Sequence, residues 1–293
     1  MMNIMHGETL PLSSFLAIII TVSVLLANPS SSSLESFVYV GCTQLKYNPG
    51  SPYESNVNSM LASLVNSASI SNFNNFKISL PGSTPSDVLY GLFQCRGDLT
   101  SSDCHRCVAA AVTRLGTFCV GTSGGALQLD GCFIKYDNAS FLGGQDKAVV
   151  SDKCGPSIGY DSETLSRRDA VMAYLTGGGG QYFRVGGSGN VQGMVQCVQD
   201  LSVSECQDCL SEAIQRLRSE CGTSSWGDMF LGKCYARYSE RGAYSSSSKS
   251  GNDDEMEKTL AIIIGLIAGV AVIIVFLSFL SRSLDRKALA LVK

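Results

Sequence analysis

The sequence predicts an α+β protein in which one cysteine-rich fold occurs twice and is followed by a single transmembrane helix. The first observation is a repeated cysteine spacing, and the second is an uncharged run of 21 residues near the C-terminus. The third is the composition, which combines twelve cysteines with 45% hydrophobic and only 16% charged residues. Many cysteines in an even number favour an oxidising compartment and a disulfide framework over a cytosolic metalloprotein.

An apolar run of 13 residues, 15–27, lies near the N-terminus and is followed by serines 30–33. The run is too short to cross a bilayer, and its layout is that of a signal-peptide core with a cleavage region of small residues. The preceding segment carries no Lys or Arg. We expect a signal peptide in residues 1–33, with cleavage between Asn28 and Leu34.

The internal repeat is recognised from two sets of five cysteines with the same spacing. Within each set the gaps are 8, 2, 11 and 12 residues, and the second set lies 102 residues after the first. Cys42 and Cys154 precede the sets, so each repeat holds six cysteines, and six cysteines allow 15 pairings. We expect homologous domains at residues 34–151 and 152–243. The two sets are Cys95, Cys104, Cys107, Cys119 and Cys132, then Cys197, Cys206, Cys209, Cys221 and Cys234.

Each repeat is expected to contain two helices packed on an antiparallel sheet. Apolar residues recur at helical spacing from Tyr53 to Ala68, and a second helix should begin after Thr100 or Ser101. Its counterpart opens with the capping-box spacing of Ser202 and Glu205. The segments expected as strands are residues 37–43, 88–95 and 126–136, whereas glycines 177–180 and 186–189 are expected in loops or hairpins.

The C-terminal part predicts a membrane anchor. Residues 244–259 are Ser-rich and then acidic, which is typical of a flexible stalk. Residues 260–280 carry no charge and are long enough for a spanning helix. Acidic residues before the span and basic residues after it place the tail, residues 281–293, in the cytoplasm. Gly265 and Gly269 have the spacing that allows two membrane helices to pack closely, so this face could associate with a second copy or a partner. The alternative is that the spacing has no function, because such patterns are common in single-span helices.

Several function classes fit the composition poorly. A net charge of −3 without a Lys/Arg-rich block argues against nucleic-acid binding. Only two histidines, His6 and His105, are present, which leaves little for a His-based metal site or catalytic triad. We expect His105 on a helix surface. We expect neither cofactor nor metal, and no enzymatic activity, because no set of nucleophile, base and orienting residue stands out.

Two local motifs remain open to a sharper interpretation. The Cys-x-x-Cys pairs beginning at Cys104 and Cys206 could hold zinc or act as redox dithiols, although an exported six-cysteine repeat favours structural disulfides. Asn138 begins Asn-Ala-Ser, the one glycosylation sequon of the expected ectodomain, and is a candidate for N-glycosylation.

The twice-repeated spacing Cys-x8-Cys-x2-Cys resembles the plant cysteine-rich repeat, also called the DUF26 or ginkbilobin-homologous domain. Two repeats, one span and a tail too short for a kinase resemble the plasmodesmata-located protein family. The resemblance implies that the first cysteine pairs with the fifth, the second with the third, and the fourth with the sixth. Here the implied disulfides are Cys42–Cys119, Cys95–Cys104, Cys107–Cys132, Cys154–Cys221, Cys197–Cys206 and Cys209–Cys234.

The resemblance also implies where a sugar would bind. Lectin members hold mannose with an Asn after the first cysteine, an Arg six residues before the last, and a Glu five residues after it. Those positions are Thr43, Ala126 and Asp137 in the first repeat, and Gly155, Asp228 and Ser239 in the second. Because the cationic donor is absent at both Arg positions, we expect that this particular lectin site is lost.

By resemblance, the protein is expected to be a type I membrane protein at plasmodesmata that restricts cell-to-cell trafficking, with callose deposition as the route. Its expected partners are the plasma membrane and proteins, among them itself, cysteine-rich receptor-like kinases or viral movement proteins, and cell-wall carbohydrate. The alternative is an apoplastic carbohydrate sensor or a co-receptor of such a kinase. An antimicrobial lectin-like protein is disfavoured by the missing Arg and by the anchor.

Overall fold

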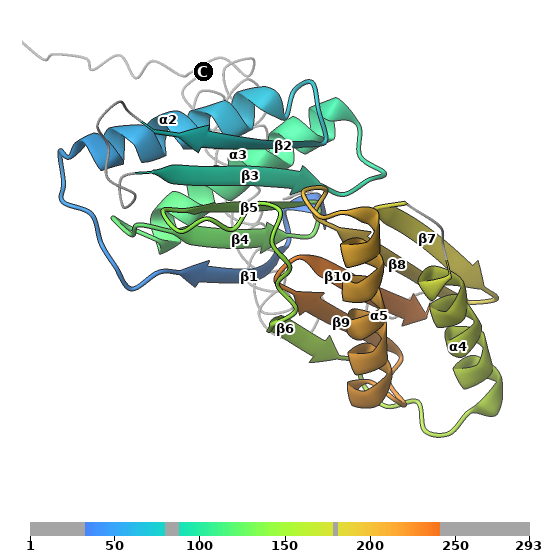
Figure 1. Cartoon of the computed structure of the whole chain (residues 1–293). Coiled ribbons are helices and arrows are strands. Elements are labelled where there is room, and N and C mark those ends of the chain that lie inside the picture. Colours follow the sequence, from blue (N-terminus) through green and yellow to red (C-terminus); the bar gives the residue numbers. More distant parts are fainter. Residues whose placement is uncertain (1–32, 80–87, 178–180, 241–293) are drawn as a thin grey trace, which may run out of the picture. The chain divides into compact units, whose positions relative to one another are not determined.

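The computed structural model describes residues 33–79, 88–177 and 181–240 (Figure 1). Within these ranges, none of the helices has the length and apolar character needed to cross a membrane. The predicted span, its Gly265 and Gly269, the stalk and the tail all lie outside the described residues, as does the predicted signal peptide except for its last residue, Ser33.

The chain divides into two compact units, Met1–Gly143 and Gly144–Lys293. The division falls eight residues before the boundary predicted between residues 151 and 152. The reason is β6, Val149–Cys154, which crosses that predicted boundary and pairs with β9 of the second unit. The second repeat therefore begins earlier than its first cysteine suggests.

The first unit is a five-stranded antiparallel sheet in the order β1-β4-β5-β3-β2, with two helices (Figure 1). The helices contact the sheet and each other and enclose a core with Met60, Leu64, Phe93 and Leu115 at its centre. Its elements are η1 (Ser33–Glu35), β1 (Phe37–Cys42), α2 (Pro52–Ser67), β2 (Phe73–Ile78), β3 (Leu89–Cys95), α3 (Ser101–Phe118), β4 (Gly125–Leu129) and β5 (Cys132–Asp137).

The second unit has the same topology, with a sheet in the order β6-β9-β10-β8-β7. Val171, Met172, Leu175 and Leu210 are central in its separate core. Its elements are β6, α4 (Ser162–Thr176), β7 (Phe183–Ser188), β8 (Val191–Cys197), α5 (Val203–Glu220), β9 (Trp226–Leu231) and β10 (Cys234–Glu240). The predicted α+β class, with two helices on an antiparallel sheet in each repeat, is confirmed.

Local sequence explains where the helices begin. Ser51, Thr100, Asp161 and Ser202 are the N-cap residues, and each side chain accepts a hydrogen bond from a backbone amide of the first turn. At α5 the predicted capping box is complete, because the Glu205 carboxylate also accepts from the Ser202 backbone amide at 2.9 Å.

The strands differ from the prediction at two places. Residues 126–136 form two strands, β4 and β5, joined by Asp130 and Gly131, because the alternating pattern continues through this short turn. The edge strand β2 was not anticipated, since its Asn and Lys residues conceal the pattern. The hairpin expected at residues 186–189 is confirmed: Gly186 and Gly187 lie in β7, which pairs with β8, and Gly189 lies in the turn between them at φ 58°.

Three disulfides in each repeat link the sheet to its second helix, α3 or α5, and together they are the six pairs that the family resemblance implies. Their Cα–Cα distances are 5.3 to 6.1 Å, the ordinary range for disulfides. The longest sequence separations belong to Cys42–Cys119, at 77, and Cys154–Cys221, at 67. These two bridges fix the edge strands β1 and β6 to the ends of α3 and α5.

Candidate functional site

The three sugar positions of the first repeat come together where β1, β4 and β5 meet. The Thr43 hydroxyl accepts a hydrogen bond from the Gly124 amide at 2.8 Å and lies 3.1 Å from the Ser123 hydroxyl. A Cβ atom added to Gly124 would lie 2.8 Å from a Thr43 methyl carbon and 2.9 Å from the Asp137 carboxyl carbon. Gly124 therefore leaves room for Thr43 and Asp137 to flank one corner, which we call the β5 corner.

Lys135 is the residue of the β5 corner that sequence reasoning missed. It pairs directly with Ala126, the position of the family Arg, so both side chains face the same side of the sheet. Its ammonium lies 4.7 Å from the centre of the Phe141 ring. The neighbouring strand β5 therefore supplies a cation, Lys135, beside Ala126, the position where lectin members have Arg. Only the register of β4 with β5 reveals this, and that register was obscured when the two strands were predicted as one.

Tyrosines surround the same corner. The Tyr53 hydroxyl donates to the Ser123 carbonyl at 2.6 Å, and the Tyr47 and Tyr53 rings lie 5.6 Å apart. Burial, and next the negative charge of Asp137, raise the pKa of Tyr53 far above its usual value. Burial likewise raises the pKa of Tyr47 and of Tyr136. The Tyr53 and Tyr136 hydroxyls are already used, because they donate to the Ser123 and Thr122 carbonyls, so the charged groups that the β5 corner offers are one carboxylate and one ammonium.

The equivalent corner of the second repeat is filled. Trp226 stands where the first repeat has Gly124, and a Cβ atom on Gly155 would lie 2.4 Å from its ring. Asp228 stands at the Arg position, and its carboxylate accepts from Arg237 at 2.8 and 3.2 Å. Only 10% of each of those side chains is exposed. Their charges are mutually satisfied in a bidentate pair, and the exposed Lys153 lies opposite Asp228 on β6.

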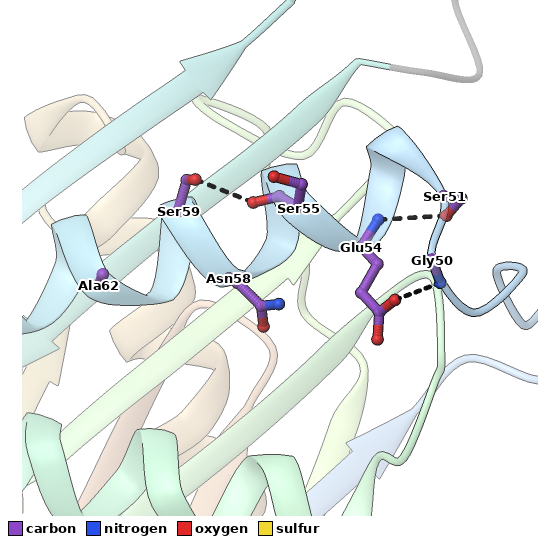
Figure 2. A pocket seen from close by; sticks show the side chains of 7 residues that line it. All are labelled: Gly50, Ser51, Glu54, Ser55, Asn58, Ser59 and Ala62. Atoms are coloured by element: carbon purple, nitrogen blue, oxygen red, sulfur yellow. Dashed lines mark hydrogen bonds between the residues drawn. The ribbon is translucent and has the colours of Figure 1, made fainter.

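The outer side of α2 forms a shallow hollow, which is drawn in Figure 2. Within it the Glu54 carboxylate accepts from the Gly50 amide at 2.6 Å, and the Ser51 hydroxyl accepts from the Glu54 amide at 3.3 Å. These polar groups are therefore used in capping α2. The lining comes from one helix and its cap: Gly50, Ser51, Glu54, Ser55, Asn58, Ser59 and Ala62. A hollow without an opposing wall cannot enclose a small molecule.

Neither Cys-x-x-Cys motif forms a dithiol pair. Cys104 and Cys107 bridge to β3 and β5, and Cys206 and Cys209 bridge to β8 and β10. All twelve cysteines lie in the described ranges, and no free cysteine is found there. The same ranges contain no group of three or more His, Cys, Asp or Glu residues placed to hold a metal ion.

His105 joins the two helices of the first repeat, since its Nδ1 lies 3.0 Å from the Val65 carbonyl. Gln207, 102 residues later, donates to the Thr176 carbonyl at the end of α4. Two different side chains at equivalent positions thus bond to the end of the preceding helix. This repetition identifies a structural role for His105.

The comparisons with known proteins agree with this architecture. The family profile described as "Salt stress response/antifungal" matches residues 41–139 and 159–241. Plasmodesmata-located protein 6 of Arabidopsis thaliana is 56% identical over 91% of this chain and 95% of its own length. Plasmodesmata-located protein 7 of the same organism is 57% identical over 92% of this chain and 90% of its own.

A solved structure gives the same result. The tandem DUF26 ectodomain of the Arabidopsis thaliana cysteine-rich receptor-like protein PDLP5 is 44% identical to this chain, with a TM-score of 0.67. It covers 70% of this chain, and this chain covers 99% of it. The chain belongs to the plasmodesmata-located protein family, built on tandem DUF26 repeats.

Proposed function

We propose that this protein is a non-enzymatic type I membrane protein of plasmodesmata that restricts molecular movement between cells through callose deposition. The observation that carries the proposal is the similarity over 91% of the chain, which extends well beyond the two repeats, to plasmodesmata-located protein 6. In this proposal the repeats are extracellular, residues 260–280 are the anchor, and residues 281–293 face the cytoplasm. A membrane of distinctive thickness could sort such a single span.

The test is the localisation of a fluorescent protein fused after residue 293. We expect wall-spanning puncta that coincide with callose stain, and slower spread of a mobile fluorescent tracer between cells when the protein is overproduced. Deletion of residues 260–293, with the fluorescent protein after residue 259, should release the repeats into the apoplast. Uniform plasma-membrane fluorescence, or unchanged tracer spread, would count against the proposal.

Partners belong to the same proposal. We infer that the repeats bind an extracellular or membrane-bound protein, with a second copy of the chain, a cysteine-rich receptor-like kinase or a viral movement protein as candidates. Self-association through the span is tested in a membrane reporter with Gly265→Ile and Gly269→Ile. Bulky side chains at these positions should weaken it by blocking close helix approach. Unchanged association would exclude this face.

The β5 corner favours a second candidate function, an apoplastic carbohydrate sensor or co-receptor. Lys135 beside Ala126 restores a cation near the family Arg position, and Asp137 is a shorter carboxylate than the family Glu. Charged and hydroxyl groups in one corner can orient sugar hydroxyls. The test compares glycan-array binding by the purified protein and by its variants Lys135→Met and Asp137→Asn. Lys153→Met, in the second repeat, is the matched control. Binding that survives both first-repeat variants would refute this use of the corner.

A further inference from the structure

The chain leaves the β5 corner through a tight turn. The Asp137 side chain accepts a hydrogen bond from the Ala139 amide at 3.0 Å. Two residues further on, Phe141 places its ring against the Lys135 ammonium. Residues 138–141 therefore fold back along β5 from Asp137 to Lys135, beside the polar groups of the corner.

This turn carries the sequon Asn138-Ala139-Ser140, the only Asn-x-Ser/Thr tripeptide of the whole sequence whose middle residue is not proline. Ala139 and Ser140 are exposed, and Asn138 is half-buried at the end of a strand. Surface loops of exported chains are where such sequons are used. The aligned residue of the second repeat is Glu240, which begins no sequon.

We propose that Asn138 carries an N-linked glycan and that this glycan covers the β5 corner. In the modification, Asn138 Nδ2 forms a bond to C1 of the first sugar, and the bond from that carbon to a lipid-linked diphosphate breaks. The diphosphate leaves with the electron pair, and Nδ2 loses one proton to solvent. Asn138 directly follows Asp137, and residues 138–141 run back past Lys135, so a glycan attached at Asn138 is within reach of both charged groups. The inference rests on the proposed extracellular position of the repeats.

Modification is tested on the full-length protein produced in plant cells, by its mass before and after treatment with peptide-N-glycosidase A. We expect the untreated protein to carry the mass of one glycan, lost on treatment and absent in both Asn138→Gln and Ser140→Ala. Tyr160→Asn is the matched positive control. It creates a sequon with Asp161 and Ser162 at a site that is 90% exposed in the second repeat, and should add a second glycan.

The outcomes separate two kinds of failure. If the Tyr160→Asn variant gains a glycan while Asn138 carries none, the repeats are exported and the inference is wrong. If neither position is modified, both the inference and the proposed extracellular topology are overturned. A glycan on Asn138 supports the inference whatever the localisation experiment finds.

Coverage is tested by the rate at which an amine-acylating reagent labels Lys135, followed by peptide mass spectrometry. The reagent should label Lys135 several-fold faster in the Asn138→Gln variant than in the glycosylated protein, because the glycan no longer shields the corner. Labelling of Lys153 in the second repeat should be equal in the two proteins. Equal Lys135 rates would show that the glycan points away from the corner and would overturn this part of the inference.

Discussion

In the first repeat, Arg96 contacts Asp98 at 2.7 Å and Asp130 at 2.6 Å, and 46% and 22% of those two acidic side chains are exposed. In the second repeat, the charge at this place comes from Lys233, which pairs with Asp200, and only 2% and 3% of these side chains are exposed. The Asp98 and Asp200 positions correspond, yet their cations come from different strand ends. The same framework thus accepts an open ion-pair network in one copy and a buried pair in the other.

A second difference lies on the first helix of each repeat. A Cβ atom on Gly91 would meet Met60, and one on the equivalent Gly193 would meet Val171, so Met60 and Val171 occupy corresponding positions. Val57 and Arg168 lie three residues before them and therefore also correspond. Val57 is part of the apolar core, whereas Arg168 is buried and donates to the Gly222 carbonyl just beyond α5. A cation near a helix C-terminus is favourable. Three disulfides per repeat hold the scaffold while its interior polarity changes, which allows one copy to leave its corner unfilled by protein side chains and the other to fill it with Trp226.

The largest expected effect tests whether the two frameworks are equivalent. Replacing both cysteines of Cys42–Cys119 by Ala should cost about 4 kcal/mol, and replacing Cys154–Cys221 about the same, because the chain-entropy cost depends weakly on loop length. Hydrogen exchange of peptides from each repeat, in the detergent-solubilised protein, measures both losses separately. A markedly smaller loss in one repeat would break the equivalence.

The second-largest expected effect is a difference in the stability lost when the ion pairs of the two repeats are broken. Lys233→Met strands a buried carboxylate and should cost about 3 kcal/mol or more. Arg96→Met removes a cation from more exposed partners and should cost about 1 kcal/mol. The double variant Lys233→Met/Asp200→Leu should recover most of the stability, because no unpaired charge remains buried. Equal losses in the two single variants, read by urea unfolding, would refute the contrast.

The paired glycines test packing at one equivalent point. A Cβ atom on Gly193 would meet Val171 and Leu175 at 2.8 and 2.9 Å and the Arg237 carbonyl at 3.1 Å. Gly193→Ala should therefore cost about 2 kcal/mol, since branched side chains and backbone cannot move aside. On Gly91 the three nearest atoms would all belong to the Met60 side chain. That thioether is flexible, so Gly91→Ala should cost under about 1 kcal/mol. Thermal unfolding, together with hydrogen exchange of peptides from each repeat, distinguishes the stability losses of the two variants.

Sequence reasoning succeeded where a local pattern determines the structure. The cysteine gaps located both repeats, and the Ser202 and Glu205 spacing located the start of α5, because each signal depends on residues close together in the chain. β2 was missed because an edge strand with solvated Asn and Lys side chains has weak alternation.

The candidate site was harder to predict than the fold because it depends on register and on partners distant in sequence. Lys135 acquires its meaning only when β5 pairs with β4 and brings it opposite Ala126. Trp226 fills the second corner only because β6 brings Gly155 against its ring. Arg168 would be expected on a helix surface, and only the approach of Gly222 explains its burial. Single positions compared with a family motif cannot reveal such replacements.

The smallest expected effect concerns acid pH at the start of α5. Hydrogen bonds from the Ser202 side chain and then its backbone hold the pKa of Glu205 below the usual value of 4.5. Because the folded pKa is lowered, the stabilisation is present above the unfolded value and is lost as pH falls through the folded one. A carboxyl ¹³C titration of glutamate-labelled protein should place Glu205 below 4.5, with the signal assigned by its absence in Glu205→Gln. Ser202→Ala should raise that midpoint, because the side-chain donor is removed. A midpoint unchanged by this variant would mean that Ser202 does not hold the carboxylate, and the complete capping box would no longer distinguish α5 from α3.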